Sequence, residues 1–212
     1  MEFRKMAQNL GEAPFPRHVI LEMLKDYKRP NDKISELIKK GDLLSIRRGL
    51  YIPGRETGLP IPAPFLIANH LRGPSYVSLE SALSHWGLIP EKVHEITSVT
   101  IKTSKKYKTL AGRFSYYSLP SPYYSFGIER IQLTSKQTAL IASREKAVCD
   151  KVILTSGITF RSTTQTMDFL LDDMRMDETV LRTLDRSVIY SWLNDAPKKS
   201  SLMMLVKTLD KL

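Results

Sequence analysis

The sequence contains only one cysteine, Cys149, among its 212 residues. A disulfide within the chain is therefore excluded, and this sparing use of cysteine suits a reducing compartment such as the cytoplasm. Cys149 follows Ala147 and Val148 in an apolar stretch. We expect it to be a small residue of the core and not a nucleophile.

Long apolar runs are missing as well. No run approaches the ~20 apolar residues that are needed to span a bilayer, and residues 1–5 lack the apolar centre of a secretory signal. We therefore expect a cytoplasmic protein without a membrane partner. Hydrophobic residues still make up 42% of the chain, which is enough for a folded core and excludes a disordered protein.

Features of an enzyme's active site are scarce. The chain has no glycine-rich phosphate loop and no serine elbow, and Asp26, Tyr27 and Lys28 only weakly resemble the acid–lysine element of nucleases. Glu145 is expected to favour the N-terminus of its helix, which leaves Lys146 exposed. The histidines show no metal-ligand spacing; they are His18, His70, His85 and His94. We predict no catalytic residue, metal or cofactor.

Positive charge is abundant instead. The chain has 32 basic and 22 acidic residues, a formal net charge of +10. Residues 1–58 carry 12 basic and 8 acidic side chains and residues 59–135 carry 8 and 4, so each part has +4, whereas 136–212 has +2. A basic protein suits phosphate partners because neutralised phosphates release counterions. Many basic proteins nevertheless bind no nucleic acid.

Residues 33–53 carry the most informative pattern. Three apolar residues recur at helical spacing and form one stripe: Ile34, Leu37 and Ile38. Asn31 or Asp32 is expected to cap the start of this helix, after Pro30. Gly41 stands where a left-handed residue ends a helix.

After this helix the apolar period changes to two. Leu44 and Ile46 alternate with polar residues, and Gly49 suits a tight hairpin turn. The pattern predicts a two-stranded hairpin with Arg47 and Arg48 at its tip.

Two more helices are expected before residue 30. The first is marked by Phe3, Met6, Ala7 and Leu10 and is ended by Gly11. The second covers residues 17–27, and the basic turn 28–31 joins it to the third helix with helix-turn-helix proportions. A third helix followed at once by a basic hairpin is the layout of a winged helix-turn-helix, whose helix enters a DNA groove while the hairpin contacts phosphates. The other interpretation is a unit that only packs or docks a protein.

The predicted DNA contacts lie on the turn, the third helix and the hairpin tip. A recognition helix reads bases mainly from its N-terminal part, which favours Lys33, Ser35 and Glu36. A glutamate such as Glu36 is able to accept a hydrogen bond from a cytosine amine. The full set of predicted contacts is Lys28, Arg29, Lys33, Ser35, Glu36, Lys39, Lys40, Arg47 and Arg48.

The sequence predicts an α+β protein of three parts. A linker rich in proline and glycine covers residues 54–64, so we place an N-terminal winged helix-turn-helix domain at residues 1–58. A mixed α/β domain is expected at 59–161 and a helical C-terminal segment that packs on it at 162–212. In the mixed domain, helices are expected at 64–71, 78–86 and 143–154 and strands at 95–102, 112–119 and 127–133.

A lysine-rich segment lies between the first two of these strands. It is either a second phosphate contact or a solvated hairpin tip. Its lysines are Lys102, Lys105, Lys106 and Lys108.

Three blocks of the chain resemble the AbiEi-type antitoxin family of bacterial type IV toxin-antitoxin systems, which are winged-helix transcriptional regulators. The blocks are LIKKGDL running into RGLY at 37–51, YVSLESALSHWGLIP at 76–90, and IASREKAVCD at 141–150. The third block departs from the family pattern at Arg144, where a small residue or proline is usual, and at Val148, where leucine is usual.

The resemblance implies that the head binds operator DNA of its own operon. It also implies that the rest of the chain carries antitoxin activity against a nucleotidyltransferase-like toxin encoded beside it. Two hypotheses follow: a DNA-binding autoregulator and antitoxin, or a winged-helix protein-interaction module that does not bind DNA.

Overall fold

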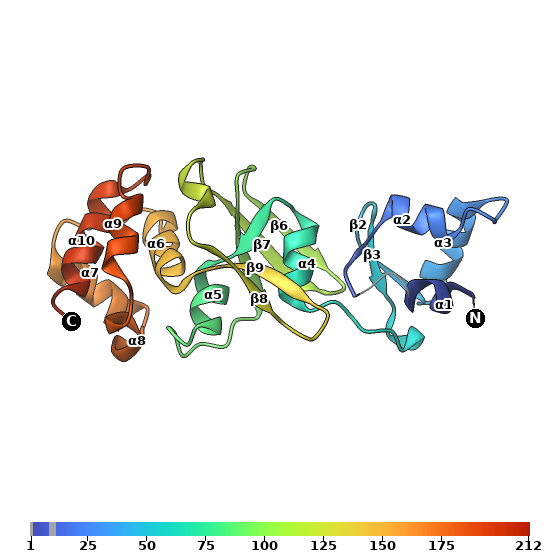
Figure 1. Cartoon of the computed structure of the whole chain (residues 1–212), viewed down its shortest axis with the longest axis horizontal. Helices are drawn as coiled ribbons and strands as arrows, with labels where there is room; N and C mark the ends of the chain where they lie inside the picture. Colours follow the sequence, from blue (N-terminus) through green and yellow to red (C-terminus); the bar gives the residue numbers. More distant parts are fainter. Residues whose placement is uncertain (1, 9–11) are drawn as a thin grey trace.

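The computed structural model describes residues 2–8 and 12–212. Leu10 and Gly11, which were expected to continue and end the first helix, lie outside the described residues. An elongated molecule places a helical head at the N-terminal end, a six-stranded sheet in the middle and a group of helices at the C-terminal end (Figure 1). The expected α+β class is confirmed.

The head alternates helices with a small sheet. Its strand β3 lies between β1 and β2 and is antiparallel to both. The expected helices and hairpin are present, but the second helix ends at Met23 and not at residue 27 as predicted. Strand β1 is too short for its pattern to be visible in the sequence. The elements are α1 (Glu2–Gln8), β1 (Phe15–Pro16), α2 (Arg17–Met23), α3 (Pro30–Lys39), β2 (Leu43–Arg47) and β3 (Leu50–Pro53).

Helix α3 begins earlier than expected. Pro30 is its first residue, and Arg29 occupies the N-cap position without a side-chain cap. The expected caps at Asn31 and Asp32 are therefore wrong, because proline needs no amide partner in the first turn and lets the helix start there. The C-terminus is as expected, since Gly41 has a φ of +76°.

The β2–β3 hairpin is buried on both of its faces. The period of two puts Tyr51 on the face opposite Leu50 and Ile52. Tyr51 belongs to the core of the head, whereas Ile46, Leu50 and Ile52 belong to the large core of the middle and C-terminal parts. In Figure 1 the hairpin accordingly lies between the helices of the head and α4. The hairpin is therefore part of two cores.

The middle part is built on a mixed sheet with the strand order β6-β7-β5-β4-β9-β8. The β5–β7 and β4–β9 pairs are parallel, and the other neighbouring pairs are antiparallel. The elements are η1 (Arg55–Thr57), α4 (Pro64–Leu71), β4 (Ser75–Val77), α5 (Leu79–His85), β5 (Glu95–Thr100), β6 (Lys105–Thr109), β7 (Gly112–Ser118), η2 (Tyr123–Ser125), β8 (Ile128–Gln132), β9 (Thr138–Ala142) and α6 (Arg144–Leu154).

The lysine-rich segment is not a hairpin tip. Its residues from Lys105 onward form β6, an edge strand that pairs with β7, and the turn between these strands is at Leu110 and Ala111. Lysines are common on edge strands because their charge opposes pairing with another chain. Lys102 precedes the strand.

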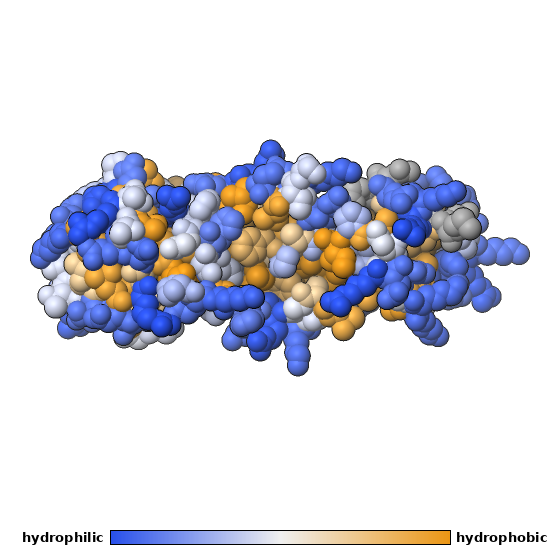
Figure 2. Space-filling model, turned by 90° about the horizontal axis from the view of Figure 1, so that it is seen from below, coloured by the Kyte–Doolittle hydropathy of each residue, from blue (hydrophilic) through white to orange (hydrophobic). Residues whose placement is uncertain are grey.

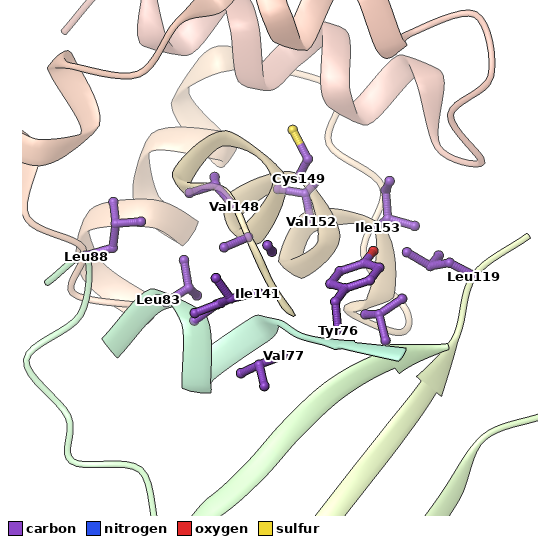
Figure 3. Packing of buried hydrophobic residues seen from close by; sticks show 14 of the residues in the cluster. Tyr76, Val77, Leu83, Leu88, Leu119, Ile141, Val148, Cys149, Val152 and Ile153 are labelled. Atoms are coloured by element: carbon purple, nitrogen blue, oxygen red, sulfur yellow. The ribbon is translucent and has the colours of Figure 1, made fainter. Parts of the chain in front are cut away.

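Short helices make up the C-terminal part, as predicted for residues 162–212. They are α7 (Thr163–Asp168), the π-helix η3 (Phe169–Asp173), α8 (Glu178–Arg182), α9 (Arg186–Trp192) and α10 (Lys199–Leu209). Helices α9 and α10 contact α6, whose other side covers the sheet. Figure 3 shows Tyr76 and Ile141 of the sheet on one side of α6, and Cys149 pointing to the other side, toward the C-terminal helices. Cys149 is fully buried, as expected.

An ion pair inside the core fastens α6 to the sheet. Lys146, which we expected to be exposed, is fully buried, and its Nζ lies 3.0 Å from the carboxylate of Asp150. Asp150 also accepts hydrogen bonds from Tyr76 and Ser78, at 2.9 and 2.8 Å. Ser78 stands at the N-cap of α5, but its hydroxyl donates to Asp150 and does not cap the helix.

The surroundings of the pair act on both pKa values. Burial raises the pKa of Asp150 and lowers that of Lys146, and the attraction between the two opposes both shifts. Lys146 gains two further partners from Tyr123, whose carbonyl oxygen accepts its hydrogen bond at 2.9 Å and whose ring centroid lies 3.3 Å from Nζ. The ammonium group is therefore held by a carboxylate, a carbonyl and an aromatic face.

No helix in the described part of the chain combines the length and apolarity that crossing a bilayer demands.

Candidate nucleic-acid interface

Helix α3 lies in the head, near the end of the molecule that is away from the central sheet (Figure 1). Ile34 and Leu37 point into the core of the head. Ser35, Lys39 and Lys40 are exposed, and Lys33 and Glu36 are partly buried. From below, hydrophilic side chains project from this end, whereas hydrophobic residues gather mainly over the middle of the molecule (Figure 2).

Most charges on α3 are paired within the helix. Glu36 lies 3.0 Å from Nζ of Lys33 and 2.6 Å from Nζ of Lys40. Hydrogen bonds from these two lysines, Lys40 first, lower the pKa of the Glu36 carboxyl. Arg29 makes a longer contact of 3.8 Å with Asp32. Lys39 forms no ion pair within the described residues.

The turn before α3 borders an open groove of about 520 Å³. Nζ of Lys33 lies 5.3 Å from the centroid of the Tyr27 ring, on the wall of this groove. Basic and acidic side chains alternate around it, so the groove is not a uniform phosphate site. Its lining residues are Tyr27, Lys28, Arg29, Asp32, Lys33 and Glu36.

Arg17 connects the β2–β3 hairpin, called the wing from here on, to α3, and this role was not predicted from the sequence. Its guanidinium group donates to the Asn31 side chain at 2.7 Å, and its backbone amide donates to the Gly49 carbonyl at 2.9 Å. Ser35 in turn donates to the Asn31 carbonyl at 3.1 Å. Asn31 therefore links two helices where a cap was expected. The only sequence signal of this role is the position of Arg17 at the start of a helix.

The tip of the hairpin carries the two exposed arginines, as predicted. Gly49 adopts a φ of +79° in the turn. Neither Arg47 nor Arg48 forms an ion pair with any residue that the structure describes. Arg47 lies near the buried Tyr116 of β7: burial raises the pKa of this phenol, and the charges of Arg72 and Arg47 oppose the shift. Ile46 and Leu50, which flank the tip, belong to the same core as Tyr116, so the hairpin packs toward the central sheet.

The lysines near β6 do not share one face. Lys105 lies opposite Tyr116 in the register with β7, so both side chains are on the side near Arg47. Strand alternation puts Lys106 and Lys108 on the other face. Lys102 donates to the Gly73 carbonyl at 2.5 Å. The structure thus brings only Lys105 of this set to the side of the wing.

Within the described residues, no group of three or more histidine, cysteine, aspartate or glutamate side chains is placed to hold a metal ion. The charged groups of the head are cations at the tip of the hairpin and a mixture of charges on α3.

Comparison with known proteins finds similarity among solved structures. No family model matches the chain, and no curated protein matches it. Among solved structures, the chain is similar to the Rv2827c protein from Mycobacterium tuberculosis, with a TM-score of 0.63 and 15% sequence identity. The alignment covers 98% of this chain and 76% of that protein. At this identity the similarity establishes a shared fold alone.

Proposed function

We propose that the chain is a DNA-binding transcriptional autoregulator and the antitoxin of a type IV toxin-antitoxin system. The observation that carries the DNA-binding part is the exposed arginine pair at the tip of a hairpin that directly follows α3. Helices and strands in this order, with a basic hairpin tip, suit a duplex that takes α3 in its groove and the wing on its phosphates.

In this proposal the contacts divide by type. Arg47, Arg48 and Lys39 have no ion-pair partner among the described residues, which leaves them available for phosphates. Ser35 and Glu36 lie on the outer side of α3, where base edges would be reached. Lys105 lies on the side of the wing and would add a phosphate contact from the central sheet.

A gel-shift titration tests DNA binding. The full-length chain is titrated against the duplex from upstream of its own coding sequence and against a random duplex of equal length, at several salt concentrations. We expect tighter binding to the upstream duplex and a linear fall of log affinity with log salt. Equal and salt-independent affinities, or no binding at all, would contradict DNA recognition.

The antitoxin part rests on the family resemblance and is assigned to residues outside the head. It is tested by co-expressing the toxin-like gene encoded beside it with the full-length chain or with its Arg47→Ala/Arg48→Ala variant from an unrelated promoter. Rescue of growth by both proteins supports an antitoxin whose action is separate from DNA binding. No rescue by the full-length chain would reduce the proposal to a regulator. We further propose that the protein acts by binding, without catalysis or a cofactor.

One observation favours the protein-interaction alternative. Asp32 and Glu36 put two carboxylates on the outer side of α3, and phosphates repel carboxylates. A negative gel shift together with normal toxin neutralisation would support this second function.

A further inference from the structure

Three charged residues of alternating sign form a row along α3. Lys33, Glu36 and Lys40 are spaced by three and four residues, so their side chains are neighbours on one side of the helix. Glu36 uses both of its carboxylate oxygens, Oε2 toward Lys33 and Oε1 toward Lys40. The Glu36 carboxylate therefore forms ion pairs with two of the lysines that were predicted to contact DNA.

The exposure of these side chains leaves the carboxylate within reach of a ligand. The Glu36 side chain is 42% exposed, compared with 23% for Lys33 and 61% for Lys40. Ion pairs at such a surface are weak. In a complex, phosphates offer the two lysines new partners of opposite charge, and the exchange is favoured when a hydrogen-bond donor takes the carboxylate at the same time.

A cytosine provides such a donor, because its amine in the major groove donates a hydrogen bond that a glutamate accepts. When the DNA has no hydrogen-bond donor opposite Glu36, the carboxylate stays paired with both lysines and also repels the nearby phosphates. Specific binding often depends on such penalties against wrong partners.

We propose that Glu36 is a specificity-determining residue, which holds Lys33 and Lys40 away from phosphates until a duplex offers it a cytosine amine. The inference rests on the proposed DNA binding and deepens it. It predicts that Glu36 weakens binding to most DNA sequences, so that the ratio of specific to non-specific affinity increases.

The test compares Glu36→Gln with Glu22→Gln in the full-length chain. Glu22 is a matched control: it pairs with Lys25 at 3.0 Å through the same i,i+3 spacing, but on α2. On a random duplex we expect Glu36→Gln to bind roughly three- to ten-fold more tightly and its log–log salt slope to steepen by about one to two phosphate contacts. Glu22→Gln should match the wild type. The ratio of upstream to random affinity should fall only for Glu36→Gln.

A variant without the two lysines separates their pairing with Glu36 from direct repulsion between the Glu36 carboxylate and the phosphates. In a Lys33→Met/Lys40→Met variant, Glu36→Gln should no longer change the salt slope. If the two single variants bind the random duplex equally, if Glu36→Gln binds it more weakly, or if the change in slope persists without the lysines, the inference is wrong. Absence of DNA binding by the wild type would instead overturn the proposed function itself. Thermal melts of all variants check that the fold is intact.

Discussion

Lys146 and Asp150 form an ion pair 3.0 Å long between two fully buried side chains, one helical turn apart on α6. The same carboxylate accepts hydrogen bonds from Tyr76 on β4 and from Ser78 directly after it. The pair therefore joins the helix to the middle of the sheet. Charges so far from water are stable only while each keeps its partners.

Replacing Lys146 with methionine should strongly destabilise the protein. The change leaves the Asp150 carboxylate buried without its counter-charge, and breaking a buried pair costs about 3–5 kcal/mol. Urea unfolding measures the loss. Lys151→Met is the control on the same helix, since its ion pair with Glu80 is partly exposed and should contribute about 0–1 kcal/mol. Equal losses in the two variants would contradict the role of the buried pair.

Removing the two arginines of the wing should weaken DNA binding without a preference for sequence. In the Arg47→Ala/Arg48→Ala variant, affinity should fall for the upstream and random duplexes alike, and the salt slope should flatten by about two contacts. Lys199→Ala/Lys207→Ala removes the same charge from α10 at the other end of the chain. An unchanged slope in the wing variant, or the same flattening in this control, would exclude the wing as a phosphate contact.

The hairpin should matter for the stability of the whole chain. Ile52 is 2% exposed and belongs to the large core, so Ile52→Ala should reduce the free energy of unfolding by about 2–5 kcal/mol. Ile38→Ala on α3 removes the same atoms from a residue that is 38% exposed, and should cost less than about 1 kcal/mol. Chemical denaturation followed by circular dichroism compares the two. A larger effect at Ile38 would mean that the hairpin does not pack as described.

Two glycines of the head should respond differently to alanine. A Cβ at Gly54 would lie 1.6 Å from the carbonyl oxygen of Gly41, so the backbone has to move, and we expect a loss of at least about 3 kcal/mol. At Gly41 itself a Cβ meets nothing within 4 Å, and only its left-handed φ of +76° opposes the change, by about 1 kcal/mol. Thermal unfolding of the two variants measures the difference. The opposite order would contradict the close approach of these two backbone segments.

Local signals in the sequence were sufficient for much of the head. The helix ending at Gly41 and the turn at Gly49 each depend on a few neighbouring residues, and the structure agrees with both. The arginine pair at the hairpin tip was visible for the same reason. Strands β5, β7 and β8 likewise lie within the segments that were predicted. Of the predicted apolar stripe, Ile34 and Leu37 are buried, whereas Ile38 is 38% exposed and lies outside the core of the head, so its place in the stripe was wrong.

Features that depend on distant partners were not visible. Lys146 resembles any exposed lysine of a first helical turn until Tyr123 and Asp150 are placed around it. Tyr51 continues an alternating pattern, which does not reveal that both faces of its strand are covered. The pairing of Lys33 and Lys40 with Glu36 was available from their spacing, yet the lysines were considered only as partners of DNA.

The β2–β3 hairpin contributes residues to two cores, and one of these cores is completed only by residues that are synthesised later. Every other buried member of the large core that Ile46, Leu50 and Ile52 join lies at residue 67 or later. A ribosome therefore releases the head while one face of its wing is still bare. Until the sheet follows, that face is open to chaperones and proteases, and a prematurely terminated chain never covers it. An incomplete copy would therefore differ from the complete chain by a bare apolar face on its hairpin.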